Sequence, residues 1–129
     1  LHSVPTDCNQ RDERQGWMGD AHVASTAMLC NFDAAATYWK WLGDMRDDQR
    51  ADGAVGDTAP YSLGRMGGDV AWGAAVVLIA WEAYLQSGDR EQLRGANRDN
   101  DGTLGLGHTA ADLGRAAEKP RYGRCVVTM

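Results

Sequence analysis

The chain has 129 residues, of which 43% are hydrophobic and 24% charged, and its formal net charge is -5. These values are typical of globular proteins and leave room for a single domain. Thirteen Lys and Arg face eighteen Asp and Glu, so no positive surplus attracts a phosphate backbone and nucleic acid is excluded as a partner. The longest apolar run, 70–85, is too short to span a membrane. We therefore expect a soluble chain, with cytoplasmic and secreted locations both open.

Two helices are expected in the first half of the chain. Asp20 is a favourable N-cap for a helix over 21–29. A second helix starts from Asp33 as its N-cap, and its apolar side chains follow the i, i+3, i+4, i+7 spacing of one buried stripe: Tyr38, Trp41, Leu42 and Met45. The segment 51–68 is rich in glycine and contains Pro60, which predicts a long loop.

A third helix is expected over 70–86, with Asp69 as its cap and Gly88 as its C-terminal stop. Glu82 is its one charge, so this helix should be buried on most sides, and three helices offer too little surface to bury it. This mismatch indicates a larger parent chain or another subunit. The fold class is therefore all-α, with 1–94 as a helical domain and 95–129 as a tail of uncertain structure.

The three cysteines fit no zinc or redox spacing. Cys8, Cys30 and Cys125 are far apart, and an odd count leaves one thiol unpaired in any pairing. We expect all three to be reduced, with Cys30 as a small core residue at the end of a helix. No metal site or cofactor is expected from them.

The first twenty residues hold a dense group of ionisable side chains. Four carboxylates lie within fourteen residues: Asp7, Asp12, Glu13 and Asp20. Cleavage of a glycosidic bond needs a protonated carboxylic acid and a second carboxylate, and Trp17 can stack on an apolar sugar face. In the structural alternative, Asp7 and Asp20 cap helices and the other charges are solvated. General physical arguments favour this structural alternative, and spacing alone does not decide between the two.

The order of the residues is more specific than their spacing. The stretch Thr6-Asp7-Cys8-Asn9-Gln10-Arg11-Asp12-Glu13-Arg14-Gln15-Gly16-Trp17-Met18-Gly19-Asp20 resembles the TDCPQRDERLGWTGD signature of bacterial α-L-rhamnosidases of glycoside hydrolase family 78. The departures are Asn9, Gln15 and Met18, at positions where the family places no chemistry. A second stretch, 69–75, resembles the AWGDA helix of the family, with Ala74 in place of the usual Asp.

This resemblance implies an (α/α)6 barrel of six helical hairpins, whose loops present carboxylates to a terminal rhamnose. Glu13 matches the general acid of the family, and Asp7, Trp17 and Asp20 match residues that hold the sugar. Trp72, in the second stretch, is a further candidate for substrate binding. The family is inverting, so a general base must face Glu13 across the sugar, with about 6.5 to 9.5 Å between the carboxyl groups. In the family that base lies further downstream, and no carboxylate of this chain matches it.

The barrel is too large for this chain. Twelve helices of about 11 to 12 residues would take roughly 140 residues. The sequence therefore predicts a fragment that carries the acid half of the site and needs the rest of its catalytic domain. Its expected partners are rhamnose-containing glycosides or oligosaccharides, with no cofactor and no metal, and the isolated chain is expected to be inactive.

Other interpretations stay open. Residues 97–108 place oxygen ligands at positions 1, 3 and 5 and Gly102 at position 6 of an EF-hand-like calcium loop, but His108 stands where a bidentate carboxylate is needed. The alternative function is thus a non-catalytic carbohydrate- or calcium-binding fragment. A milder alternative is an inverting hydrolase with the same barrel that acts on a different sugar.

Overall fold

The computed structural model describes residues 15–97, except 52, 63 and 65–68. Within this part the chain forms five helices, which are α1 (Met18–Asn31), α2 (Ala35–Asp47), α3 (Val70–Gly73), α4 (Ala75–Ser87) and α5 (Arg90–Asn97). The described residues contain no strand beyond an isolated antiparallel bridge between Trp17 and Thr58. The all-α class is therefore confirmed for this part of the chain. None of its helices is long and apolar enough to cross a membrane.

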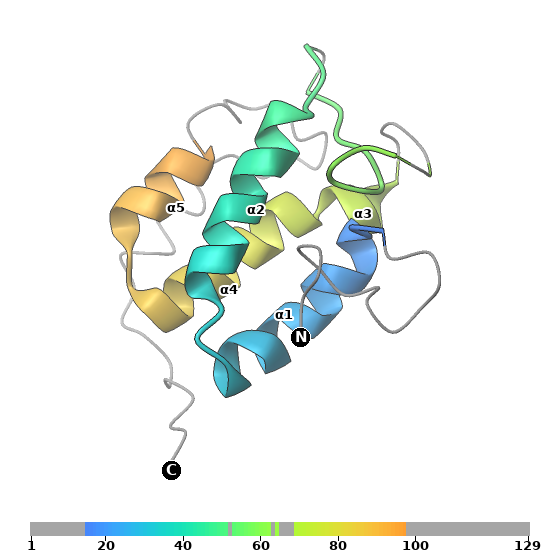
Figure 1. Ribbon diagram of the computed structural model, residues 1–129. Coiled ribbons are helices and arrows are strands. Elements are labelled where there is room, and N and C mark those ends of the chain that lie inside the picture. Colours follow the sequence, from blue (N-terminus) through green and yellow to red (C-terminus); the bar gives the residue numbers. More distant parts are fainter. Residues whose placement is uncertain (1–14, 52, 63, 65–68, 98–129) are drawn as a thin grey trace.

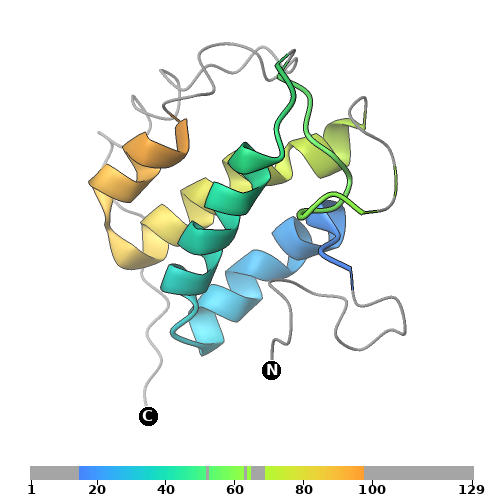
Figure 2. The same ribbon diagram turned by 45° about the horizontal axis from the view of Figure 1, so that its top comes forward.

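The helix α4 lies at the centre of the fold and packs against α1, α2 and α5 (Figure 1). Both ribbon views place α5 at one end of the molecule, and the start of α1 together with α3 at the other end (Figure 2). The two short connections, 32–34 and 88–89, make helical hairpins of α1 with α2 and of α4 with α5. The expected long loop over 51–68 contains no helix among its described residues.

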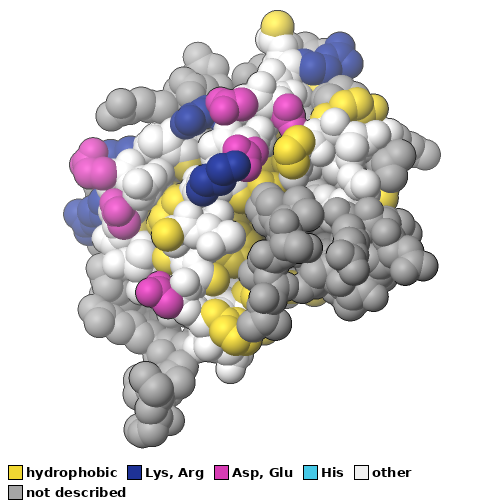
Figure 3. Space-filling view, viewed as in Figure 1, with side chains coloured by type: hydrophobic (Ala, Val, Ile, Leu, Met, Phe, Trp, Pro, Cys, Tyr) yellow, Lys and Arg dark blue, Asp and Glu magenta, His cyan; other side chains and the backbone are white. Residues whose placement is uncertain are grey.

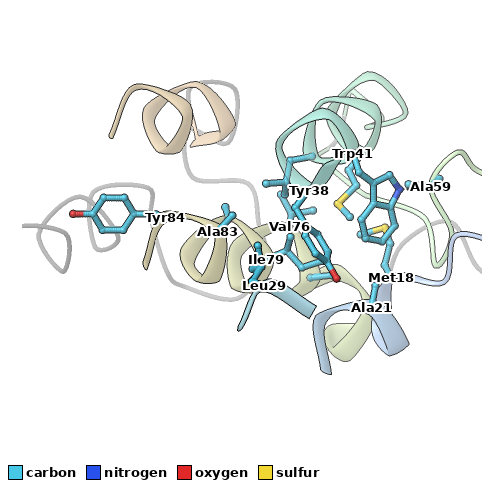
Figure 4. Packing of buried hydrophobic residues seen from close by; sticks show 14 of the residues in the cluster. Met18, Ala21, Leu29, Tyr38, Trp41, Ala59, Val76, Ile79, Ala83 and Tyr84 are labelled. Atoms are coloured by element: carbon cyan, nitrogen blue, oxygen red, sulfur yellow. Dashed lines mark hydrogen bonds between the residues drawn. The ribbon is translucent and has the colours of Figure 1, made fainter. Parts of the chain in front are cut away.

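The core is formed where α4 meets the other helices (Figure 4). The buried residues of α2 are the four expected from their spacing: Tyr38, Trp41, Leu42 and Met45. They pack with buried residues of α4, which are Ala75, Val76, Ile79, Ala80, Ala83 and Tyr84. Burying each large apolar side chain contributes about 1.5–3 kcal/mol. The apolar face of α2 therefore fixes this helix against α4.

The outer surfaces of the helices differ in polarity. Charged side chains gather over α2 and α5 (Figure 3), including the ion pairs Lys40–Asp44 and Arg94–Glu91. On α4, by contrast, Leu78 is 41% exposed. We expected α4 to be buried on most sides. Its inner face is buried, but its outer face carries the exposed Leu78.

Two helices begin differently from the sequence expectation. The N-cap of α1 is Trp17, so Asp20 lies in the first turn instead of capping the helix. The amide of Met18, at the open end of α1, donates to the carbonyl oxygen of Asp57, so a loop contact replaces the expected side-chain cap. Likewise, α2 has Ala34 at its N-cap and no side-chain cap, so the Asp33 prediction is wrong.

The helix expected over 70–86 is present in two pieces, α3 and α4, separated by Ala74. Asp69 Oδ1 accepts hydrogen bonds from the amides of Ala71 at 3.0 Å and Trp72 at 3.5 Å, as a cap should. At the other end Gly88 has a left-handed φ of 72° and its amide donates to the carbonyl oxygen of Tyr84. The predicted cap and the predicted glycine stop are both confirmed.

The helix α5 was not expected from the sequence, and it runs across the boundary that the composition suggested after Arg94. Asp89 Oδ1 accepts a hydrogen bond of 3.0 Å from the amide of Gln92. An Asp followed three residues later by Gln is a capping pattern, so the sequence did contain a signal for this helix.

Cys30 is neither the core residue nor the reduced thiol that we expected, because it is half-buried and disulfide-bonded. Its sulfur also accepts a hydrogen bond of 3.5 Å from Nε2 of Gln86, so α1 and α4 meet at this point. Cys8 and Cys125 lie outside the described residues.

Candidate active site

The described candidate residues Trp17, Asp20 and Trp72 lie on two neighbouring elements, the start of α1 and α3 (Figure 1). Asp7 and Glu13 lie outside the described residues, and so does the calcium-like loop beyond Asn97. Across the described residues, no three His, Cys, Asp or Glu side chains come together as a group that could hold a metal ion.

The loop 57–62 holds the backbone on either side of Trp17. The bridge partner of Trp17 is Thr58. On one side of the bridge, the amide of Ala59 donates to the carbonyl oxygen of Gly16 at 2.9 Å. On the other side, the amide of Met18 donates to the carbonyl oxygen of Asp57 at 2.9 Å. The Trp17 side chain is half-buried.

The loop 57–62 is in turn fixed to α2. Trp41 Nε1 donates a buried hydrogen bond of 2.7 Å to the carbonyl oxygen of Ala59, and Figure 4 shows the indole beside that residue. The amide of Tyr61 donates to Asp48 Oδ2 at 2.6 Å. Sequence reasoning missed this role of Trp41, because its place in an apolar stripe does not identify a partner for its indole N–H.

Side chains add a further link between the loop and the start of α1. Thr58 is buried, and its Oγ1 accepts a hydrogen bond of 3.0 Å from the amide of Ser62. Ser62 Oγ donates to Gln15 Oε1 at 2.5 Å. Gln15 is one of the departures from the rhamnosidase signature, so this contact uses a side chain that the signature does not contain.

Asp20 and Trp72 approach the same turn of α1. Asp20 is half-buried in the first turn of α1, a position where acidic side chains stabilise a helix. A Cβ atom at Gly19 would lie 2.6 Å from Cδ2 and Cε2 of the Trp72 indole. Only a glycine at position 19 therefore lets Trp72 pack this closely on the turn.

The Trp72 indole also carries an unsatisfied donor. Its Nε1 is buried and has no hydrogen-bond partner within the described part of the chain. A buried donor left unpaired costs about 1–3 kcal/mol, and such groups are often satisfied by bound water or by a ligand. The turn around Gly19 thus brings together the Trp72 indole and the Asp20 carboxylate, and aromatic rings and carboxylates are among the groups that bind a polyhydroxylated ring.

These features define a class: a domain of helical hairpins that presents a polar and aromatic site at one end of the helices. A family model described as the bacterial alpha-L-rhamnosidase 6 hairpin glycosidase domain matches residues 1–110. The chain belongs to this family, which confirms both the resemblance and the six-hairpin fold. The match continues beyond Arg94, the last residue of the expected helical domain.

Known relatives agree with the family. An alpha-L-rhamnosidase of Streptomyces avermitilis is 45% identical over 95 residues, which is 73% of this chain and 9% of that protein. The structure of alpha-L-rhamnosidase from Dictyoglumus thermophilum matches with a TM-score of 0.70 at 42% identity, over 77% of this chain and 11% of that one. The Streptomyces avermitilis alpha-L-rhamnosidase complexed with L-rhamnose gives a TM-score of 0.65 at 39% identity, over 69% and 9%. The chain thus spans about a tenth of the length of these relatives.

Proposed function

We propose that this chain is the part of a glycoside hydrolase that holds the acid side of a site for terminal, non-reducing α-L-rhamnose. The observation that supports this most is the placement of Trp17, Asp20 and Trp72 around one turn of α1 in a chain of the rhamnosidase family. Relatives bear the name alpha-L-rhamnosidase, and one was solved in complex with L-rhamnose.

In this proposal the aromatic and acidic residues hold the sugar. Trp17 and Trp72 contact the ring hydrogens and the methyl group of the 6-deoxy sugar, which form an apolar surface. Asp20 and Asp7 accept hydrogen bonds from the sugar hydroxyls, and these bonds are strengthened by the carboxylate charge. Together the four residues orient the glycosidic oxygen toward the acid.

Glu13 is the proposed general acid. It donates its proton to the glycosidic oxygen as the bond to the leaving group breaks. A water molecule, deprotonated by a general base, attacks the anomeric carbon from the opposite face, so the configuration inverts. We place that base outside this chain, and we expect the 129 residues alone to show no hydrolysis. Measurable turnover by the chain alone would contradict this division of the site.

Glu13→Gln, in the enzyme that carries this domain, tests the acid. We expect turnover of a rhamnoside with a poor alkyl leaving group to fall by about 10²–10⁴-fold. The loss should be smaller for p-nitrophenyl α-L-rhamnoside, whose leaving group needs little protonation, and L-rhamnose binding should remain. Glu91→Gln, a change at a carboxylate that is 75% exposed on α5, is the matched control and should leave activity unaltered. Full activity of Glu13→Gln on the alkyl rhamnoside would refute the assignment.

The stereochemistry is tested separately by proton NMR of the freshly released sugar. An inverting enzyme acting on an α-linked rhamnoside yields the β anomer first, before mutarotation mixes the two forms. Appearance of the α anomer first would contradict the inverting mechanism.

A further inference from the structure

We propose that Thr58 is a positioning residue for sugar binding, because it lies opposite Trp17 in the bridge and its buried hydroxyl supports the loop whose Asp57 and Ala59 backbone groups bond to the residues on either side of Trp17. The inference rests on the proposed function only for the role of Trp17 in binding the sugar. The positioning of Trp17 rests on the geometry of the loop 57–62.

Thr58 is unusual in being polar and almost completely buried. It is 1% exposed and lies directly opposite Trp17 in the antiparallel bridge. A buried hydroxyl destabilises the fold unless it forms hydrogen bonds. Here Oγ1 accepts the Ser62 amide at 3.0 Å and lies 3.4 Å from Ser62 Oγ. The hydroxyl therefore closes the loop between residues 58 and 62.

Closing the loop brings Ser62 to the segment that leads into Trp17. Ser62 Oγ donates to Gln15 Oε1 at 2.5 Å. Two backbone hydrogen bonds, from Ala59 to Gly16 and from Met18 to Asp57, also join the loop to residues 15–18. Thr58 lies between Asp57 and Ala59, and its hydroxyl holds Ser62, so it supports the Ser62–Gln15 hydrogen bond.

The loop has a separate attachment to α2 that does not involve the Thr58 hydroxyl. Trp41 bonds to Ala59, and Asp48 bonds to the amide of Tyr61. Removing the hydroxyl should therefore loosen the contact with Trp17 while the loop stays attached to the core. This separates a positioning role from a general contribution to folding.

Amide hydrogen exchange measures the positioning without any sugar. In Thr58→Val, which keeps the side-chain shape, we expect the Met18 and Ala59 amides to exchange about five-fold faster, the effect of losing one typical hydrogen bond. The amide of Leu42 in α2 should be unaffected. Thr58→Ser, which keeps the hydroxyl, should restore protection.

Ser25→Ala is the matched control for the loss of a buried hydroxyl. Ser25 is 0% exposed, and its Oγ donates to the carbonyl oxygen of His22 within α1. This variant should leave the Met18 and Ala59 amides protected. Unchanged exchange in Thr58→Val, or equal acceleration in Ser25→Ala, would overturn the proposal.

Titration calorimetry with L-rhamnose, on the enzyme that carries this domain, tests the consequence for binding. We expect the Kd of Thr58→Val to rise about five-fold, and that of Thr58→Ser to stay within about two-fold of the wild type. Faster exchange with an unchanged Kd would overturn the role in sugar binding. If the wild type fails to bind L-rhamnose while the exchange results hold, the proposed function fails and the positioning of Trp17 by Thr58 stands.

Discussion

Trp41 and Ala59 link the core of the fold to the candidate site. The indole Nε1 of Trp41 donates a 2.7 Å hydrogen bond to the carbonyl oxygen of Ala59, and the amide of Ala59 donates to Gly16 at 2.9 Å. A buried side chain of α2 is thereby connected, through one loop residue, to the backbone next to Trp17. A site carried by loops gains precision when a rigid helix supports it in this way.

Trp41→Phe should therefore destabilise the fold more than the same change elsewhere on α2. It leaves the buried Ala59 carbonyl without its donor and creates a small cavity, at a cost of about 2–4 kcal/mol in the free energy of unfolding. Trp39→Phe is the control, because the buried Nε1 of Trp39 has no partner in the described structure. Its cost should be at least about 1 kcal/mol smaller. Equal urea midpoints for Trp41→Phe and Trp39→Phe would argue against a stabilising hydrogen bond from Trp41 to Ala59.

Gly19→Ala should disturb Trp72. The new Cβ would lie 2.6 Å from two atoms of the indole, so the ring must move. We expect a loss of about 1–3 kcal/mol in stability and weaker binding of L-rhamnose. Gly43→Ala on α2, where nothing lies within 4 Å of the added Cβ, should instead gain about 0.5–1 kcal/mol. If Gly19→Ala melts at or above the wild-type temperature, the close packing of Trp72 on α1 is wrong.

Gly88→Ala should weaken the end of α4. Gly88 has a φ of 72°, which costs a residue with a side chain about 1–2 kcal/mol. Gly95→Ala lies in α5 with no atom within 4 Å of the added Cβ, and should be neutral or stabilising. The melting temperature should therefore fall for Gly88→Ala and stay the same or rise for Gly95→Ala. A stabilised Gly88→Ala would contradict the left-handed cap.

The sequence predicted the elements that depend on local rules. The spacing of Tyr38, Trp41, Leu42 and Met45 identified the buried face of α2, and the pair Asp69 and Gly88 bounded the apolar helical segment. These signals succeed because a helix repeats every 3.6 residues, and because caps involve neighbours in sequence.

The sequence did not predict what depends on distant contacts. The start of α1 at Met18 reflects a hydrogen bond to Asp57, which is 39 positions further along the chain. The support of Trp17 by Thr58 has the same long-range origin. The approach of Trp72 to Gly19 also joins residues that the spacing of side chains cannot connect. The resemblance to the family identified Trp17, Asp20 and Trp72 as candidate residues. The fold adds that α1 and α3 are neighbours, so that Trp72 of α3 lies beside Gly19 of α1.

Titration calorimetry with L-rhamnose, on matched variants of the enzyme that carries this domain, tests whether the turn of α1 around Asp20 binds rhamnose. Asp20→Ala and the isosteric Asp20→Asn should both lose binding while remaining folded. Asp33→Ala, at an exposed residue just beyond the other end of α1, should bind as the wild type does. Undiminished binding of L-rhamnose by Asp20→Ala, or a wild-type protein that binds calcium and no L-rhamnose, would show that this turn is not a rhamnose site.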